Sequence, residues 1–459
     1  MKRDDDSELA GTFLGALHLL WAVAVTASTT LVAMVKAAID VALVGRVDAA
    51  QLAAFAFVFP VLFLAISGGR AIYTGTAATF IVGNGLHNGR VQIKPLVCAL
   101  VLSAAVGLCL GVLLLVLLQA YVQIMGAEEY SEYLKQYFSI WVWTIPMMFM
   151  SANTFAIARN MGFITLAGTF TLIANMVGIA CSWVFIPDNG MGMGLGLQGS
   201  AYSMFVTSAI STGLCLFFVV KRTISDSGVQ WIIQFLGTSK KVIGVAVPVL
   251  LSNILLFAFI TFTTKIIALY GQDALAAFGA IGRIEQILLA FQIAFTTVAI
   301  ASFSRCFAQN DWSEGLAYFR RIIGLMLGVG VVFSLLSIAV NSLVASSLAP
   351  TPASSAITAF YLKLLTIAVF FQGEFLLAVT ILNLIGEPQR ALLWCFMNYC
   401  VVGPVFLGLS VIGSDVRFCL VAMSVANMAF GIFALRRVYA LLEIKGAMFG
   451  QKYQQTVLG

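Results

Sequence analysis

The chain has 459 residues, of which 61% are hydrophobic and only 10% are charged, and its mean hydropathy is +1.02. Ordinary globular domains carry roughly 25% charged residues, so this chain has too few polar side chains to cover a water-facing surface. The composition excludes a soluble multidomain protein and predicts an integral membrane protein with the lipid bilayer as its partner. The net charge of +6 reflects basic residues gathered on one side of the membrane, and no nucleic-acid partner is expected.

Apolar segments follow one another along the chain, and most have about 20 residues or more, the length that a helix needs to cross a bilayer. The predicted fold class is an all-α polytopic membrane protein with twelve transmembrane helices. The first nine residues, "MKRDDDSEL", lead into the first segment without a cleavage site of small residues, so this end is expected to be retained. The segments are approximately 12–44, 51–82, 95–120, 133–157, 163–187, 200–220, 242–268, 275–303, 321–348, 357–383, 391–412 and 416–435.

Basic residues are distributed unevenly between alternate loops, and this asymmetry predicts the orientation. If the N-terminus is cytoplasmic, the outside regions hold only Arg46, Lys135, Lys265, Lys363 and Arg417, while the other basic loop residues lie inside. Cytoplasmic loops of membrane proteins carry an excess of lysine and arginine. Both termini are therefore predicted to lie in the cytoplasm, with the chain in a bacterial inner membrane.

The two halves of the chain share features in the same order. "LAAF" at residues 52–55 recurs at 275–278, and the segments before the fifth span of each half place a glycine ahead of Asn175 and Asn398. Secondary transporters are commonly built from such repeats, with the substrate path between them. The predicted domains are an N-terminal six-helix lobe over 1–220, a polar, basic cytoplasmic linker over 221–241, and a C-terminal six-helix lobe with a cytoplasmic tail over 242–459.

Three stretches resemble signature segments of the multidrug and toxic compound extrusion (MATE) transporters. They are "IDVALVGRVDAAQLAA" in the first helix, "GLGLQGSAYSMFVTSAIS" at the sixth and "ALAAFGAIGRIEQILLAFQIAFTTVAIASFSRCFAQN" in the eighth. The resemblance covers roughly residues 12–435 and implies two pseudo-symmetric lobes around a V-shaped cavity. It further implies an antiporter, taken here as a monomer, that exports organic cations or amphipathic drugs and metabolites. Inward H⁺ or Na⁺ would drive the export, and no other cofactor is expected.

Three basic and three acidic residues lie inside apolar segments, where a charge costs several kcal/mol or more and marks a functional hypothesis. Lys36 and Asp40 are four residues apart and share a helix face. They form either a structural ion pair or a coupling site at which a proton and a substrate cation compete. The resemblance implies a coupling role for Asp40, which matches the functional aspartate of the family. The six residues are Lys36, Asp40, Arg70, Arg283, Glu285 and Glu374.

The N-terminal lobe departs from the family pattern in three ways, one of which is that the first helix lacks the proline that many members use to bend it. Lys36 occupies a position that is usually uncharged, and it is either a permanent partner of Asp40 or a releasable one that an incoming cation replaces. The second possibility is favoured, and Arg70 is a further candidate partner for Asp40. Asn175 is expected in the site, but the following "MVGIAC" lacks the acid that family members often carry there. This gap shifts the expected coupling toward the C-terminal carboxylates.

In the C-terminal lobe, Glu374 has no basic neighbour in the sequence, so it is expected to be protonated or to bind a cation. Arg283 and Glu285 are two residues apart and point to different helix faces, so they cannot simply pair with each other. Glu285 is a candidate for the cavity. Arg283 is a charge partner for backbone carbonyls or for a carboxylate of a neighbouring helix.

The sequence leaves two other functional interpretations open. One is a dedicated exporter or flippase of a single metabolite or lipid-linked intermediate. The other is a membrane-embedded enzyme, which the sequence disfavours because it contains no HExxH, GxSxG or P-loop motif and has only two histidines. No enzymatic activity and no metal site are therefore expected.

Overall fold

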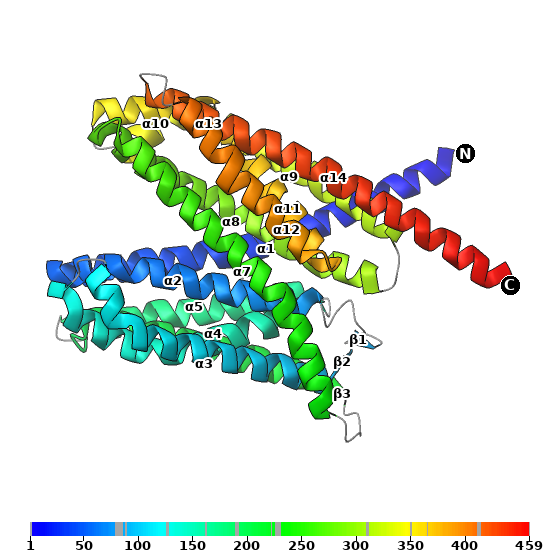
Figure 1. Cartoon of the computed structure of the whole chain (residues 1–459), viewed down its shortest axis with the longest axis horizontal. Helices are drawn as coiled ribbons and strands as arrows, with labels where there is room; N and C mark the ends of the chain where they lie inside the picture. The colour runs from blue at the N-terminus through cyan, green and yellow to red at the C-terminus, as the bar shows by residue number, and fades with distance from the viewer. Residues whose placement is uncertain are drawn as a thin grey trace. The chain divides into compact units, whose positions relative to one another are not determined.

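A computed structural model describes residues 2–78, 86–87, 90–124, 128–160, 163–188, 192–221, 223–224, 231–308, 312–348, 351–364, 366–410 and 415–458. The described chain is helical apart from three short strands and its connections (Figure 1). The helices up to the middle of the chain are α1 (Lys2–Val47), α2 (Ala49–Thr76), α3 (Ile93–Ile124), α4 (Ser131–Asn160), α5 (Ile164–Phe185), α6 (Gly196–Val220) and α7 (Trp231–Ala268), with a 3₁₀ turn at Glu128–Tyr130.

The later helices are α8 (Gln272–Ala308), α9 (Trp312–Leu348), α10 (Pro352–Leu364), α11 (Thr366–Leu384), α12 (Pro388–Phe396), α13 (Gly403–Ser410) and α14 (Val416–Leu458). Within the described residues, each predicted apolar segment overlaps one helix or a run of consecutive helices. Ten helical stretches in the described part of the chain are long and apolar enough to cross a membrane. The two remaining long helices, α2 and α4, have 28 and 30 residues, which also exceeds the length needed to cross.

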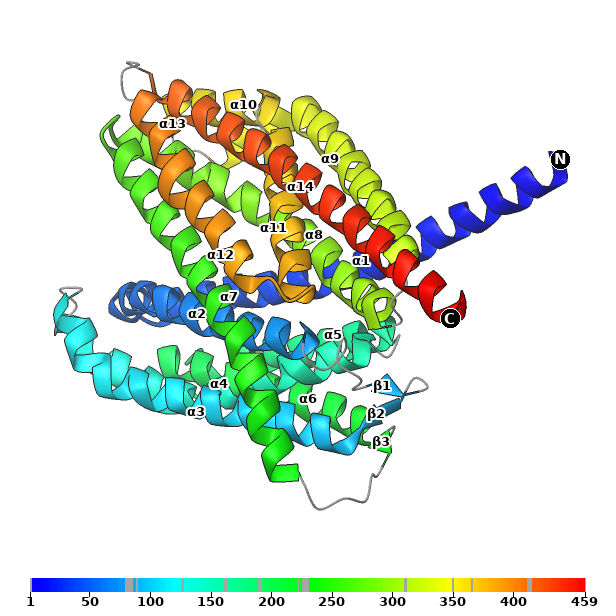
Figure 2. The ribbon, with the colours of Figure 1, turned by 45° about the vertical axis from the view of Figure 1, so that its right-hand side comes forward.

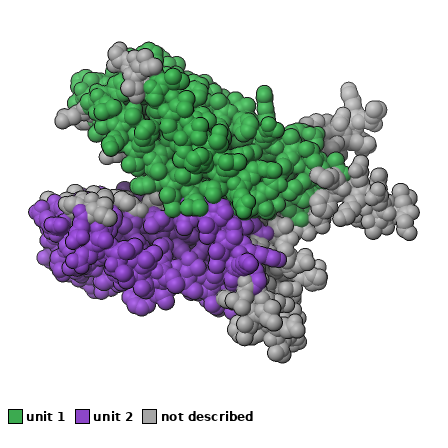
Figure 3. Space-filling view, in the orientation of Figure 1, with its two compact units in different colours: residues 1–27, 251–459 green, residues 28–250 purple. Residues whose placement is uncertain are grey.

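The chain forms two compact units, coloured separately in Figure 3. Unit 2 comprises residues 28–250, and unit 1 comprises residues 1–27 and 251–459. Both α1 and α7 therefore contribute to both units. The predicted lobe limits at 220 and 242 stay a prediction. Residues 231–241 of the predicted linker belong to α7, while residues 225–230 lie outside the described part of the chain.

In unit 2, α4 is the central helix and packs against α2, α3 and α6. Its buried side chains form the largest part of an aromatic core, and Phe55 of α2 joins them through an edge contact with Tyr137. Between helices in a membrane, close packing rather than water exclusion supplies most of the stabilisation, so shape matters more than hydrophobicity. The fully buried large side chains of α4 are Leu134, Tyr137, Phe138, Trp141, Ile145 and Phe149.

Small residues at every fourth position of α3 bring its backbone close to α4. Gly107 and Gly111 form a glycine-x-x-x-glycine pattern, and a Cβ atom at Gly107 would lie 2.7 Å from Cα of Pro146. Proline lacks the N–H that would bind the carbonyl of Val142 one turn earlier. That carbonyl oxygen lies 3.2 Å from the position of a Cβ at Gly111, so the glycines of α3 pack where Pro146 interrupts the hydrogen bonding of α4.

In unit 1, α11 is the central helix and packs against α8, α9, α12 and α14, as Figures 1 and 2 show from two sides. The described fourth span of each half thus lies at the centre of its own unit, as the repeat in the sequence would require. All but five residues of α11 are buried, among them Glu374. An apolar helix in this position makes any charged residue on it costly unless it has a partner or a function.

The eleventh predicted segment, 391–412, is divided by a π-helical stretch at Met397–Val402 between α12 and α13. Pro404 follows this stretch and would clash with the carbonyl of Cys400 in a regular α-helix, which accounts for the wider turn. Tyr399 of the π-helical stretch is buried, and its ring lies 5.7 Å from Phe259 and 5.9 Å from Phe375.

A small sheet in unit 2 ties two connections together. Strand β2 (Arg90–Gln92) pairs antiparallel with β1 (Leu86–His87) and parallel with β3 (Thr223–Ile224), with Val91 opposite Thr223. The segment after α2 is therefore joined to the segment after α6. This pairing anchors the beginning of the predicted linker to unit 2.

We predict that Gly107→Ala destabilises the protein by about 1–3 kcal/mol, because the new methyl group meets the backbone of Pro146, which cannot move aside. Gly213→Ala is the matched control, since a Cβ on this helical glycine of α6 meets no atom within 4 Å. Thermal unfolding of the purified protein in detergent measures the difference. Equal unfolding temperatures for the two variants would contradict the close α3–α4 contact.

Candidate functional site

Lys36 and Asp40 form an ion pair in unit 2, one turn apart on α1. The ammonium Nζ lies 2.8 Å from Oδ2 of Asp40, and each side chain is only 7% exposed. The other carboxylate oxygen, Oδ1, accepts a hydrogen bond of 2.5 Å from the hydroxyl of Ser182 on α5. Both oxygens of Asp40 are therefore engaged, one by a cation and one by a neutral donor.

The hydroxyl of Ser182 belongs to a short polar network between α5 and α6. Its oxygen lies 2.7 Å from that of Ser203, and both hydroxyls approach the backbone carbonyl of Gly178, at 3.0 and 2.9 Å. Each serine has a single proton to donate. When Ser182 donates to Asp40, Ser203 can donate to Ser182 or to the Gly178 carbonyl, and the buried oxygens are satisfied.

Gly178 also makes room for the lysine side chain. A Cβ atom at this position would lie 2.7 Å from Cε and 3.2 Å from Cδ of Lys36, and would collide with the hydroxyl of Thr207. The aliphatic part of Lys36 therefore lies along α5 in a space that only glycine leaves free. This fit places the ammonium beside Asp40.

Within the described residues, no hydrogen bond or ion pair joins the other predicted residues of the N-terminal half to this pair. The amide of Asn175 donates to the carbonyl of Thr171 in its own helix, at 2.9 Å. Arg70 is exposed on α2 and forms no ion pair among the described residues. Lys36 rather than Arg70 is the observed partner of Asp40.

In unit 1, Glu285 of α8 and Tyr361 of α10 form a second polar contact. The phenol of the buried Tyr361 donates a hydrogen bond to Oε1 of the partly buried Glu285. The side chain of Arg283 lies outside the described residues, so its predicted role as a charge partner stays a prediction.

Glu374 differs from the other predicted carboxylates. It is fully buried in α11, and neither of its oxygens has a hydrogen-bond partner among the described residues. The amide of Gln292 on α8 donates to the carbonyl of Val369 at 2.5 Å. Its own oxygen has no hydrogen-bond partner in the part of the chain that the structure describes, and it lies against Gly373, next to Glu374 in the chain. Carboxylate and amide oxygens only accept hydrogen bonds, so this region of α11 presents buried acceptors without a described donor.

Sequence reasoning missed Ser182, Ser203, Gly178 and Tyr361. Ser182 follows Asn175 by two helical turns on one face of α5, so its position could have been read as a polar replacement for the missing acid. Ser203 and Tyr361 act across helix contacts, and their sequence neighbourhoods carry no signal for those contacts.

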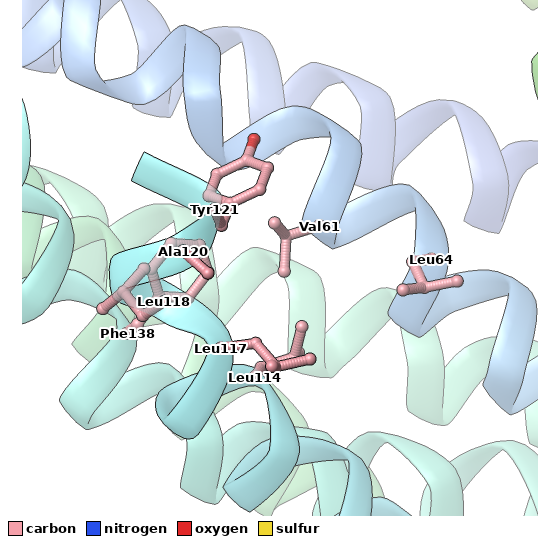
Figure 4. Close-up of a pocket in the computed structure, with 8 residues that line it drawn as sticks. All are labelled: Val61, Leu64, Leu114, Leu117, Leu118, Ala120, Tyr121 and Phe138. Carbon is pink, nitrogen blue, oxygen red and sulfur yellow. The ribbon is translucent and has the colours of Figure 1, made fainter. Parts of the chain in front are cut away.

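An apolar cavity of about 370 Å³ in unit 2 lies between α2, α3 and α4, apart from these charged groups (Figure 4). No charged residue lines it, and none of the predicted site residues does. Its one hydroxyl, on Tyr121, donates to the carbonyl of Phe57 at 2.6 Å. The lining residues are Val61, Leu64, Leu114, Leu117, Leu118, Ala120, Tyr121 and Phe138.

Comparison with known proteins gives a family and a fold. The family model MatE matches residues 26–184 and 248–407. No curated protein sequence matches the chain. An aspartate-to-asparagine mutant of the Vibrio cholerae MATE transporter VcmN has a similar structure, with a TM-score of 0.83 and 20% identity over 93% of this chain and 96% of that one.

Two further solved structures are similar. One is a MOP superfamily transporter from Pyrococcus furiosus, with a TM-score of 0.79 and 17% identity over 92% of this chain and 96% of that one. The other is an outward-facing multidrug resistance MATE family transporter, with a TM-score of 0.81 and 16% identity over the same shares. These matches confirm the predicted fold class of twelve transmembrane helices in two lobes.

We predict that Gly178→Ala lowers the unfolding free energy by about 1–3 kcal/mol, because the methyl group displaces the Lys36 stem and the Thr207 hydroxyl from their packed positions. Gly244→Ala is the control, since this exposed helical glycine of α7 has no atom within 4 Å of a Cβ. Chemical or thermal unfolding in detergent compares them. A Gly178→Ala protein as stable as the control would show that the lysine does not occupy this space.

Proposed function

Because this chain belongs to the MATE family of transporters, we propose that it is a secondary antiporter in which Glu374 takes up the coupling ion. Its substrates in this proposal are organic cations or amphipathic drugs and metabolites, exported in exchange for H⁺ or Na⁺. The observation that carries the proposal is the buried carboxylate of Glu374 without a partner among the described residues.

An ionised carboxylate without a partner is too costly to keep in an apolar interior. Such a group is stable when it carries a proton or binds a cation, and either species neutralises it. The neighbouring oxygen of Gln292, which also has no partner among the described residues, adds a second acceptor for a donor or a cation. A site that needs one positive species, and can take a proton, a metal ion or an organic cation, suits exchange of one for another.

The other predicted residues support this assignment by contrast. Asp40, Glu285 and Asn175 each have a hydrogen-bond partner within their own unit. A predicted role for them in coupling or substrate binding stays a prediction. Among these four residues, Glu374 is the one without a partner in the described protein. A transported ion would supply the missing interaction.

Exchange through such a site follows from simple competition. Binding of the coupling ion neutralises Glu374 and lowers its affinity for a cationic substrate, while loss of the ion restores that affinity. When the ion arrives from outside and the substrate from the cytoplasm, alternating access gives export. We place the chain in a bacterial inner membrane as a monomer, with both termini cytoplasmic.

A second candidate function is dedicated export or flipping of one anionic metabolite or lipid-linked intermediate. It is favoured by Arg70, an exposed cation on an apolar helix that forms no ion pair within the described residues. The similar Pyrococcus furiosus structure is described as having a binding pocket whose reverse polarity suggests a different function. Efflux of a cationic dye that anionic metabolites do not compete with would count against this second function.

We predict that Glu374→Gln abolishes gradient-driven export, because the amide cannot bind and release a proton or a cation as a carboxylate does. Proteoliposomes containing a cationic fluorescent dye, with pH and sodium gradients imposed separately, measure the effect. Coupled export should fall roughly tenfold or more, a factor that lies within the range produced by typical coupling free energies between two binding sites.

Glu128→Gln is the control for this experiment, because Glu128 is an exposed glutamate of the 3₁₀ turn before α4. It should transport as the unaltered protein does. Full coupled export by a folded Glu374→Gln protein would refute the assignment of Glu374.

A further inference from the structure

We propose that Lys36 is a built-in counter-ion, which keeps Asp40 neutralised throughout transport and removes this carboxylate from ion exchange. The inference rests on the proposed function and deepens it, because it assigns coupling to the C-terminal half alone. It also reverses the expectation from the sequence that an incoming cation replaces Lys36.

Each oxygen of the Asp40 carboxylate already has a strong partner within the protein. Its Oδ2 atom is 2.8 Å from the lysine ammonium, and its Oδ1 atom accepts from Ser182 at 2.5 Å. A transported cation would have to displace a charged group that is tethered one helical turn away. A tethered partner competes at high effective concentration, whereas a free ion pays the full entropic cost of binding.

The space beside Asp40 also fits the side chain of a lysine. Gly178 leaves the space that Cδ and Cε of Lys36 occupy, since a Cβ there would lie 3.2 and 2.7 Å from these atoms. A lysine that left Asp40 would have to abandon this packed position with its stem as well as its charge. The glycine at position 178 of α5 therefore leaves the space that the lysine at position 36 of α1 fills.

Every member of this network belongs to the same compact unit. Lys36, Asp40, Gly178, Ser182 and Ser203 all lie within residues 28–250. A change in the relation between the two units need not break any of these contacts. The pair can remain intact while the transporter alternates between its states.

Two further titratable side chains interact electrostatically with the pair among the described residues. They are Tyr137 of α4, which interacts with Asp40, and Cys181 of α5, which interacts with Lys36. A phenol ordinarily titrates at about pH 10 and a thiol at about pH 8.5, so both are mainly neutral at pH 7 and add no charge to the pair.

The test is a set of variants in the dye-export assay. Asp40→Asn and Lys36→Met each leave one buried charge unpaired and should lose transport by roughly tenfold or more, with lower thermal stability. The double variant K36M/D40N removes both charges. It should transport within about threefold of the unaltered protein, with the same dependence on pH and sodium, since a neutral pair can replace a buried ion pair.

A folded K36M/D40N protein that binds dye but no longer responds to either gradient would overturn the proposal, because Asp40 would then be part of the coupling. The variant Glu374→Gln reports separately on the proposed function. Coupling lost in K36M/D40N and kept in Glu374→Gln would refute both assignments, whereas coupling lost in both would refute only the built-in counter-ion.

A measurement on the unaltered protein covers the case in which the double variant does not fold. Competitive acetylation with acetic anhydride, read by mass spectrometry, reports how accessible and free the Lys36 amine is. Lys36 should stay unreactive relative to the exposed Lys135, with and without cationic dye and across the pH range used for transport. Labelling of Lys36 that appears when dye is added would show a releasable lysine and overturn the proposal.

Discussion

Neutralisation of charge at membrane depth is the constraint on which the account depends. An ion in an apolar interior is tolerated only with a partner, and this chain meets the requirement in different ways at the carboxylates of its apolar helices. Asp40 has a lysine and a serine hydroxyl, while Glu285 has the phenol of Tyr361. Glu374 has no partner among the described residues, and in the proposed function a proton or a cation neutralises it.

Helix packing explains how these side chains are held at such precise places. In each unit the fourth span is central, α4 in one and α11 in the other, and small residues let neighbouring backbones approach it. Gly107 and Gly111 do this for α3, and Gly178 does it for a side chain rather than for a helix. These glycines mark the positions where a neighbouring backbone or side chain packs closely, because no larger residue would leave space for it.

The sequence allowed the helical fold to be predicted, because an apolar segment of membrane length has few alternatives. It also predicted the Lys36–Asp40 contact, since residues four apart on one helix are neighbours whatever the rest of the chain does. Contacts across helices, such as Ser182 with Asp40 or Tyr361 with Glu285, depend on helix rotation and were not predictable. The π-helical stretch at Met397–Val402 was not predictable either. Pro404 indicates that the helix is irregular here, but it does not indicate which irregular form the helix takes.

The most direct measurement of the central claim is ion displacement by substrate, without any gradient. Purified protein in weakly buffered detergent is mixed with a cationic dye, and released protons or radioactive sodium are counted. The account predicts release from the unaltered protein and from K36M/D40N, and none from Glu374→Gln. Release that persists in Glu374→Gln and disappears in K36M/D40N would contradict it, because the coupling ion would then reside at Asp40.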